Sequence, residues 1–269
     1  MPYVGGKQTI ADRIVALMEP HVHYVEPFFG GGSVLFAKPS APMETINDVD
    51  EHLVTFWRVL RNRPHELAWV CSTTPHSRRE MTATRDISAG DPDELERARR
   101  VWVQLTQGRA ARLTRTGWRY VITEAAKHSL PDYLDGYLGR LLDAAERLRG
   151  VSLECRDGLA LINAYDAPRT CFYVDPPYLG STRGRNTLYA REMPNADEHA
   201  RLLDALLACR GQVILSGYAS PLYDEALAGW ERIEVGVRDQ ASRDRVEVLW
   251  TNRLPQPTLL NHLPEGPRP

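Results

Sequence analysis

Short extended stretches alternate with helix-like segments along most of the chain. Extended stretches occupy residues 24–26, 45–47, 151–153, 171–174 and 213–215. Helical spacing, with an apolar residue every three or four positions, covers residues 10–18, 53–60, 134–148 and 202–207. Gly150 and Gly211 are placed to end two of these helices, and Asn195 with Glu198 resembles a capping box that opens the last one. This alternation predicts an α/β protein with a mostly parallel sheet covered on both faces.

The alternation breaks between about Leu60 and Leu130. This stretch is polar, rich in arginine and poor in strand-forming residues, which predicts an inserted and largely helical domain. From Leu254 onwards the chain is rich in proline, which predicts a loosely ordered tail.

Composition and charge limit the function classes. Hydrophobic residues make up 43% of the 269 residues and charged residues 25%, which excludes a mainly disordered or collagen-like chain. The formal net charge is −2, so a nucleic-acid partner would have to meet a local basic surface. No apolar run approaches the roughly 18 residues of a membrane span, and the amino terminus lacks a signal-peptide core. We therefore expect a cytoplasmic protein with no membrane partner.

Cysteines and histidines give no indication of a metal site. The four cysteines are scattered without a Cys-x-x-Cys pair, which fits a reduced compartment better than a disulfide scaffold. None of the eight histidines lies at ligand spacing from a cysteine or a carboxylate. We therefore expect no metal in this protein.

The first motif with chemical content is a glycine run, Gly30-Gly31-Gly32, directly after an extended stretch. Glycines at the carboxyl end of a strand allow a tight turn and the close approach of a ligand. Asp48 follows Gly30 by 18 residues and ends the next strand, where a carboxylate can accept hydrogen bonds from ribose hydroxyls. The pair predicts a nucleoside cofactor, although the spacing is not the Gly-x-Gly-x-x-Gly of dinucleotide-binding oxidoreductases.

The second motif is Asp-Pro-Pro-Tyr at 175–178, after the apolar stretch 171–174. Its two prolines stiffen the backbone and lack amide donors, which leaves carbonyl groups free to accept hydrogen bonds. Asp175 adds a carboxylate acceptor, and Tyr178 adds a flat ring. Together they are suited to hold a planar group that carries an amino function.

Four motifs occur in one order: Tyr-x-Gly-Gly-Lys at 3–7, Glu-Pro-Phe-Phe-Gly-Gly-Gly-Ser-Val at 26–34, Asn47-Asp48, and the motif at 175–178. In this combination the chain resembles the Dam-type adenine-specific DNA methyltransferases, which use S-adenosylmethionine to methylate the exocyclic amino group of adenine. The resemblance covers about 1–54 and 150–253.

The resemblance implies a role for each matching position. The residues near the methyl donor would be Tyr3, Lys7, Phe28, Gly30, Gly32, Asp48 and Asp157. Lys7 would lie close to the donor carboxylate or to the active-site loop, Asp48 would hold the ribose, and Asp157 would lie near the donor adenine. For Asp157, a solvated turn residue is an equally good interpretation. The target base would be bound by Asp175, Pro176, Pro177 and Tyr178.

A stripe of positive charge lies in the expected insert. Seven arginines and no acidic residue occur between Arg97 and Arg119, which suits a surface that follows DNA phosphates. Within it, residues 114–121 resemble the glycine-centred DNA-contacting segment of the family, with departures around Tyr120 and Ile122 that leave the recognised sequence open. The DNA-binding residues that we expect are Arg109, Arg112, Arg115 and Arg119, together with Arg183 and Arg185 in a second basic loop.

We therefore expect an α/β fold with a Rossmann-like class I methyltransferase domain formed by residues 1–54 and 150–253. A helical target-recognition insert would occupy 55–149, and a proline-rich tail 254–269. The expected reaction transfers a methyl group from S-adenosylmethionine to the 6-amino group of adenine in double-stranded DNA, with base flipping. Methylation of the 4-amino group of cytosine, or a catalytically silent DNA-binding module, is the alternative. A bacterial or phage origin, with or without a partner restriction endonuclease, stays open.

Overall fold

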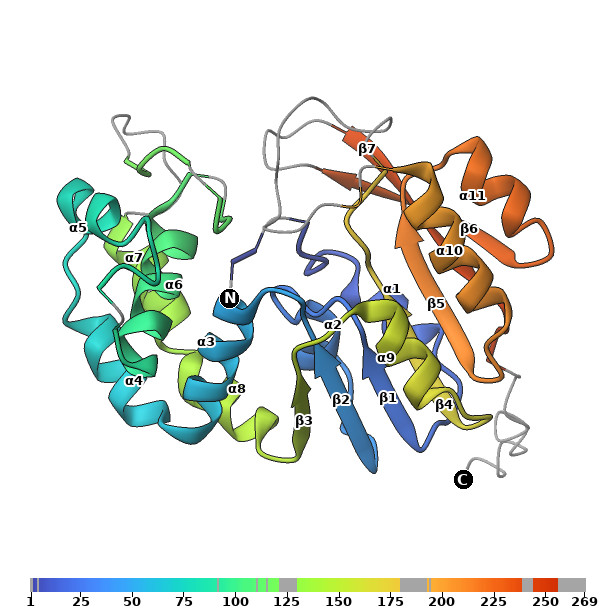
Figure 1. Ribbon diagram of the computed structural model, residues 1–269, viewed down its shortest axis with the longest axis horizontal. Coiled ribbons are helices and arrows are strands. Elements are labelled where there is room, and N and C mark those ends of the chain that lie inside the picture. Colours follow the sequence, from blue (N-terminus) through green and yellow to red (C-terminus); the bar gives the residue numbers. More distant parts are fainter. Residues whose placement is uncertain are drawn as a thin grey trace, which may run out of the picture.

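The computed structural model describes residues 2–3, 5–90, 92–109, 111–114, 116–120, 130–179, 193, 195–238 and 244–255. Its centre is a seven-stranded sheet with the order β3-β2-β1-β4-β5-β7-β6 (Figure 1). The strands are β1 (His23–Glu26), β2 (Met43–Asn47), β3 (Val151–Glu154), β4 (Thr170–Val174), β5 (Gln212–Gly217), β6 (Glu231–Arg238) and β7 (Asp244–Thr251). The first five are parallel, and β7 runs antiparallel to both β5 and β6. The expected Rossmann-like α/β fold is confirmed, with a carboxyl-terminal hairpin that the sequence pattern did not predict.

Helices cover both faces of the sheet, as the alternating pattern predicted. Side chains alternate along β4, so that Cys171 and Tyr173 belong to one buried cluster and Phe172 and Val174 to the other. The first cluster also includes residues of α2 (Ser33–Ala37) and the region around α1 (Ala11–Ala16). The second includes residues of α9 (Gly158–Tyr165), α10 (Ala196–Leu207) and α11 (Pro221–Ala226). The carboxyl ends of the parallel strands are thereby left as the edge where the motifs meet.

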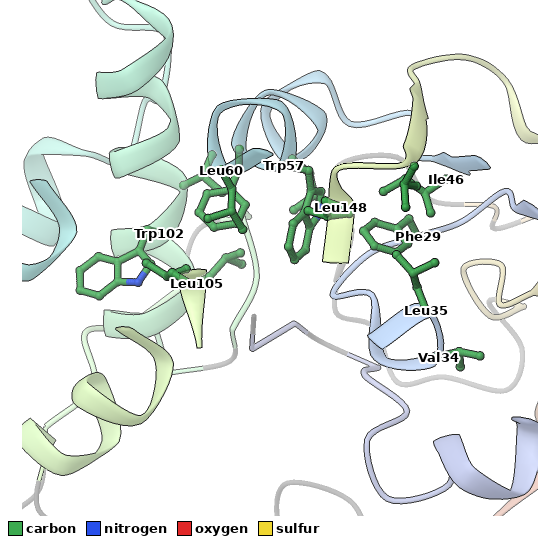
Figure 2. Packing of buried hydrophobic residues seen from close by; sticks show 14 of the residues in the cluster. Phe29, Val34, Leu35, Ile46, Trp57, Leu60, Trp102, Leu105 and Leu148 are labelled. Atoms are coloured by element: carbon green, nitrogen blue, oxygen red, sulfur yellow. The ribbon is translucent and has the colours of Figure 1, made fainter. Parts of the chain in front are cut away.

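The segment between β2 and β3 is helical throughout its described parts, and it lies beside the β3 edge of the sheet (Figure 1). Its helices are α3 (Glu51–Asn62), α4 (Pro64–Ser72), α5 (Arg78–Ala83), α6 (Glu94–Gln107), α7 (Leu130–Leu138) and α8 (Leu141–Leu148). Asp50 caps α3 by accepting hydrogen bonds from the amides of His52 and Leu53. One cluster of buried residues extends from Val34 in α2 and Ile46 in β2 through Trp57 in α3 to Trp102 in α6 (Figure 2). The sheet and the helices therefore share one hydrophobic core.

Two helix predictions need correction. The segment 134–148 forms two helices, because the chain turns at Gly139, whose amide donates back to the Asp135 carbonyl, before α8 begins. Helix α10 starts where the capping pattern predicted, but Asn195 makes no side-chain capping hydrogen bond, and the helix ends at Leu207, before Gly211. In the described part of the chain, no helix is long and apolar enough to cross a membrane.

Candidate active site

A cavity of about 310 Å³ opens at the carboxyl ends of β1, β2, β3 and β4. This is the edge at which open α/β sheets bind ligands. The cavity brings together nine residues predicted from the motifs: Tyr3, Lys7, Phe28, Gly30, Gly32, Asp48, Asp157, Asp175 and Pro177. Five separate segments of the chain thus form one site.

The glycine run forms a tight turn above β1. Gly30 and Gly32 have φ angles of +50° and +72°, which side chains other than that of glycine rarely adopt. A Cβ atom at Gly30 would lie 3.0 Å from the Tyr3 ring, and one at Gly32 would lie 2.5 Å from the Phe29 ring. Because no larger residue fits, the backbone itself forms this wall of the cavity.

Asp48 connects the second strand to the glycine turn. Its Oδ2 accepts a hydrogen bond of 3.0 Å from the Gly30 amide, and its Oδ1 accepts one of 3.0 Å from the Asp50 amide. Burial raises the pKa of Asp48 to about 6, against two amide hydrogen bonds that favour the charged form. Each oxygen retains a lone pair, so the carboxylate can accept hydrogen bonds from a pair of neighbouring hydroxyl groups.

The start of α9 forms a further wall of the cavity. Asp157 is the N-cap residue of α9, and its carboxylate accepts a 3.0 Å hydrogen bond from the Ala160 amide. The ring of Phe28 packs so closely on Gly158 that a Cβ atom there would lie 2.7 Å from it. Asp157 therefore fits both interpretations, because it is an exposed turn residue and also lines the cavity.

Asp175 directly follows β4, and each of its carboxylate oxygens accepts a hydrogen bond. Lys7 Nζ donates to Oδ2 at 2.7 Å, and Ser216 Oγ donates to Oδ1 at 2.9 Å. The carboxylate still has 19% of its side-chain surface exposed, at the cavity wall. It is oriented by two partners and remains able to accept hydrogen bonds from a ligand.

Tyr178 does not line the cavity in this structure, and its side chain is buried. Its hydroxyl accepts a 2.7 Å hydrogen bond from Lys7 and donates a short one to Glu247. Its ring packs edge-on against Tyr218, with a centroid distance of 4.6 Å. Lys7 contacts the 175–178 loop and also lines the cavity. Pro176 is also buried away from the cavity.

Comparison with known proteins agrees with this geometry. Residues 3–102 match the family model described as D12 class N6 adenine-specific DNA methyltransferase. Over these residues the chain is similar to this class of enzyme. The type II methyltransferase M1.LlaDCHI of Lactococcus lactis subsp. cremoris is 28% identical over 273 residues, a match that covers 93% of each chain.

Solved structures resemble this chain only loosely. An rRNA methylase from Streptococcus thermophilus has 8% identity and a TM-score of 0.38, with 91% of this chain and 95% of that chain covered. Precorrin 8w decarboxylase from Methanobacterium thermoautotrophicum has 11% identity and a TM-score of 0.38, with 92% of each chain covered.

Three side chains of the site were not predicted as functional. Glu26, at the end of β1, lines the cavity, and its Oε2 accepts a 2.8 Å hydrogen bond from Tyr24. Burial raises the pKa of Glu26 to about 8, so the carboxyl is protonated at neutral pH. Ser216 and Glu247 reach the site from β5 and β7. Glu26 stands in a recognised motif, and Glu247 begins the stretch 247–252, which is part of the resemblance, but neither was given a role. Ser216 has no local pattern that marks it.

Three of the seven arginines in the stripe lie beside carboxylates of the protein itself. Arg99 pairs with Glu80 and Glu96 at 2.6 Å each, and Arg100 pairs with Glu96 at 2.8 Å. Arg97 lies 3.9 Å from Glu51. The excess of positive charge counted from the sequence was too large, because the counted window began one residue after Glu96 and omitted carboxylates on α3 and α5.

The arginines beyond α6 pack on aromatic rings instead. The guanidinium of Arg109 lies 4.8 Å from the Tyr120 ring centroid, and that of Arg119 lies 4.5 Å from Tyr133. Arg78, which the sequence did not single out, lies 4.7 Å from Trp118 and 5.6 Å from Tyr120. The other expected DNA-binding residues are Arg112, which is half-buried, and Arg115, Arg183 and Arg185, which fall outside the described residues. No group of three possible metal ligands occurs among the residues that the structure describes.

Proposed function

We propose that this methyltransferase modifies adenine within a specific sequence of double-stranded DNA, and that the target base leaves the helix to enter the cavity beside Asp175. The observation that carries the proposal is that Asp48 and Asp175 line the same cavity. A nucleoside donor bound at Asp48 and a base bound at Asp175 would then share one enclosed space, as direct transfer between them requires.

The donor-binding part of the proposal rests on the glycine turn, Phe28, Asp48 and Asp157. The turn offers a close backbone wall, Asp48 offers lone pairs to the ribose hydroxyls, and Phe28 and Asp157 border the end of the cavity at α9. S-adenosylmethionine, the donor of this enzyme class, supplies the electrophilic methyl group. The described residues thus fit its nucleoside portion in size and in polarity.

The base-binding part rests on the loop after β4. A paired adenine has its amino group inside the duplex stack, so the base must be extruded before the enzyme can reach it. Asp175 and the free carbonyl groups next to Pro176 and Pro177 would accept hydrogen bonds from the amino group, which raises electron density on its nitrogen. The nitrogen attacks the methyl group of the donor directly, and the rate of this displacement depends mainly on how the two are positioned. The nitrogen loses a proton after it has gained the methyl group.

We assign DNA binding to Arg109, Arg112 and Arg119, and also to Arg115, Arg183 and Arg185, which lie outside the described residues. We add Arg78, because among the described residues neither Arg78 nor Arg109 forms an ion pair. Both guanidinium groups lie against the Trp118–Tyr120 pair, whose rings are stacked with centroids 5.7 Å apart. Unpaired arginines beside aromatic rings are suited to phosphate and base contacts.

These assignments divide the chain into three parts. Residues 1–54 and 150–253 would form the methyltransferase domain, 55–149 the target-recognition insert, and 254–269 a proline-rich tail. Because the Lactococcus relative is a type II methyltransferase, a partner restriction endonuclease with the same target sequence is the context that we favour.

Nucleoside mass spectrometry tests the proposal. DNA of mixed sequence is incubated with the enzyme and S-adenosylmethionine and is then digested to nucleosides. We expect N6-methyladenine and no N4-methylcytosine, and sequencing of a methylated random duplex library should return one short motif. N4-methylcytosine as the product, or adenine methylation without a sequence motif, would contradict the proposal.

A further inference from the structure

A largely buried group of four side chains includes two residues of the 175–178 loop. It consists of Lys7 from the amino-terminal loop, Asp175 and Tyr178 after β4, and Glu247 from β7. The exposed fractions of the Lys7 and Glu247 side chains are 5% and 7%. Three distant parts of the chain therefore meet at one place that solvent barely reaches.

Hydrogen bonds connect Lys7, Tyr178 and Glu247 in this group. Lys7 Nζ donates to the Gly5 carbonyl at 2.8 Å, to Asp175 at 2.7 Å and to the Tyr178 hydroxyl at 2.7 Å. Because the hydroxyl accepts from Lys7, its own proton needs another acceptor, and Glu247 Oε1 takes it. The position of the Tyr178 ring is thus fixed by its hydroxyl.

One cation serves two carboxylates in this group. Lys7 Nζ lies 2.7 Å from Asp175 and 3.2 Å from Glu247. Burial raises the pKa of Glu247 above its usual range, while the positive charge of Lys7 opposes the shift. When Glu247 is ionised, the positive charge of Lys7 interacts with both carboxylates and neutralises each one less. Asp175 therefore remains a stronger hydrogen-bond acceptor than it would be if Lys7 paired with it alone.

We propose that Glu247 is a positioning residue for methyl transfer, which acts by holding the Tyr178 hydroxyl and by sharing Lys7 with Asp175. Glu247 is not among the residues that line the cavity, so it would act through these two partners and without touching either substrate. The inference rests on the proposed role of the 175–178 loop in binding the target base.

The conservative variant Glu247→Gln separates charge from shape. Glutamine can still accept the Tyr178 proton, but Lys7 would then pair with Asp175 alone and weaken it as an acceptor. We expect kcat to fall by about 10- to 100-fold, the scale of a small displacement at the reacting centre. The dissociation constant for S-adenosylmethionine should stay unchanged, since Glu247 lies outside the cavity lining.

The pH profile provides a readout that a purely structural residue would not change. The titratable groups that face Glu247 are Lys7, Asp175 and Tyr178. Since the pKa of Glu247 is raised, its protonation should lower wild-type kcat at a higher pH than an ordinary glutamate would. In Glu247→Gln this acid limb should be absent or moved to lower pH.

A double-mutant cycle completes the test. Methyl transfer to mixed-sequence phage DNA is measured at saturating donor for wild type, Glu247→Ala, Tyr178→Phe and the double variant that carries both changes. Glu234→Gln on β6, an exposed residue paired with Arg232 at 2.8 Å, is the matched control for Glu247→Gln and should equal wild type. We expect the double variant to lose no more than the worse single variant, because Glu247→Ala and Tyr178→Phe break the same hydrogen bond.

Two outcomes would overturn the inference alone. One is a Glu247→Gln rate within about twofold of an active wild type, and the other is a pair of losses that multiply in the double variant. Wild-type protein that transfers no methyl group to DNA would overturn the proposed function and this inference together, so the two failures are distinguishable.

Discussion

At the scale of single residues, the site depends on carboxyl groups whose surroundings differ. Asp48 accepts two amide hydrogen bonds and has lone pairs free for a ligand, and Asp175 is bound by Lys7 and Ser216. Glu26 is enclosed and holds a proton at neutral pH. These differences assign different tasks to residues of the same chemical type.

Removal of the Asp48 carboxylate should weaken donor binding. We expect Asp48→Ala to cost about 1.5–3 kcal/mol, the scale of hydrogen bonds to a charged group. Isothermal titration with S-adenosylmethionine measures this loss directly. An unchanged dissociation constant would contradict the placement of the ribose at Asp48.

Donor affinity should also depend on pH through the same group. Because the pKa of Asp48 is raised to about 6, the carboxylate gains a proton as the pH falls through 6 and loses its strength as an acceptor. Affinity should therefore decrease below pH 6 in the wild type and stay flat over this range in Asp48→Asn. Equal pH dependence in the two proteins would assign the titration to another group.

The motif residues could be predicted from the sequence, and most of their partners could not. Glycines, Asp48 and Asp175 follow strands, and the carboxyl ends of parallel strands meet at one edge. Ser216 lies within a strand whose two faces are both buried, so no alternation of polar and apolar positions distinguishes it. The pairing of β4 with β5 brings Ser216 to the site, and the pairing of β5 with β7 brings Glu247 there.

At the scale of elements, the glycine turn is the most constrained segment of the site. A Gly32→Ala variant would place its Cβ 2.5 Å from Phe29 and 2.7 Å from Phe36, at a φ of +72°. Gly90→Ala is the matched control, because Gly90 has a φ of +74° and open space around it. We expect the control to lose about 1 kcal/mol of unfolding free energy and Gly32→Ala to lose at least ~1 kcal/mol more. Equal losses in urea unfolding would mean that the turn can relax around a methyl group.

The arginines of the insert should differ in their contribution to DNA binding, according to whether a carboxylate of the protein already pairs with them. Neutralising a residue that contacts a phosphate reduces the salt slope of DNA binding by about one unit. We expect this reduction for Arg78→Gln and Arg109→Gln, and no change for Arg100→Gln, whose guanidinium is bound to Glu96 and to backbone carbonyls. Duplex binding measured from low to moderate salt tests the division, and a reduced slope for Arg100→Gln would contradict it.

The count of charges along α6 could not anticipate this division. A helix brings residues three and four positions apart into contact, so Glu96 neutralises Arg99 and Arg100 from outside the counted window. Glu80 reaches Arg99 from a different helix, which only the tertiary structure reveals.

At the scale of the whole molecule, the helical segment and the sheet are joined by a continuous core. Leu148 of α8 and Trp57 of α3 lie between the sheet residue Ile46 and Trp102 of α6 (Figure 2). We therefore expect one cooperative unfolding transition, in which circular dichroism and tryptophan fluorescence coincide. Leu148→Ala should lower the unfolding free energy of the whole protein by about 2–5 kcal/mol. Two separate transitions would show that the insert folds independently.

The central claim is that Asp175 takes part in methyl transfer within a cavity shared with the donor. Single-turnover methylation of DNA by Asp175→Ala, with the donor dissociation constant measured on the same protein, tests it most directly. We predict a rate at least ~100-fold below wild type, the usual cost of losing a key electrostatic contact, with donor binding nearly unchanged. A variant that keeps more than about a tenth of the wild-type rate, or one that loses donor binding as strongly as its rate, would contradict the account.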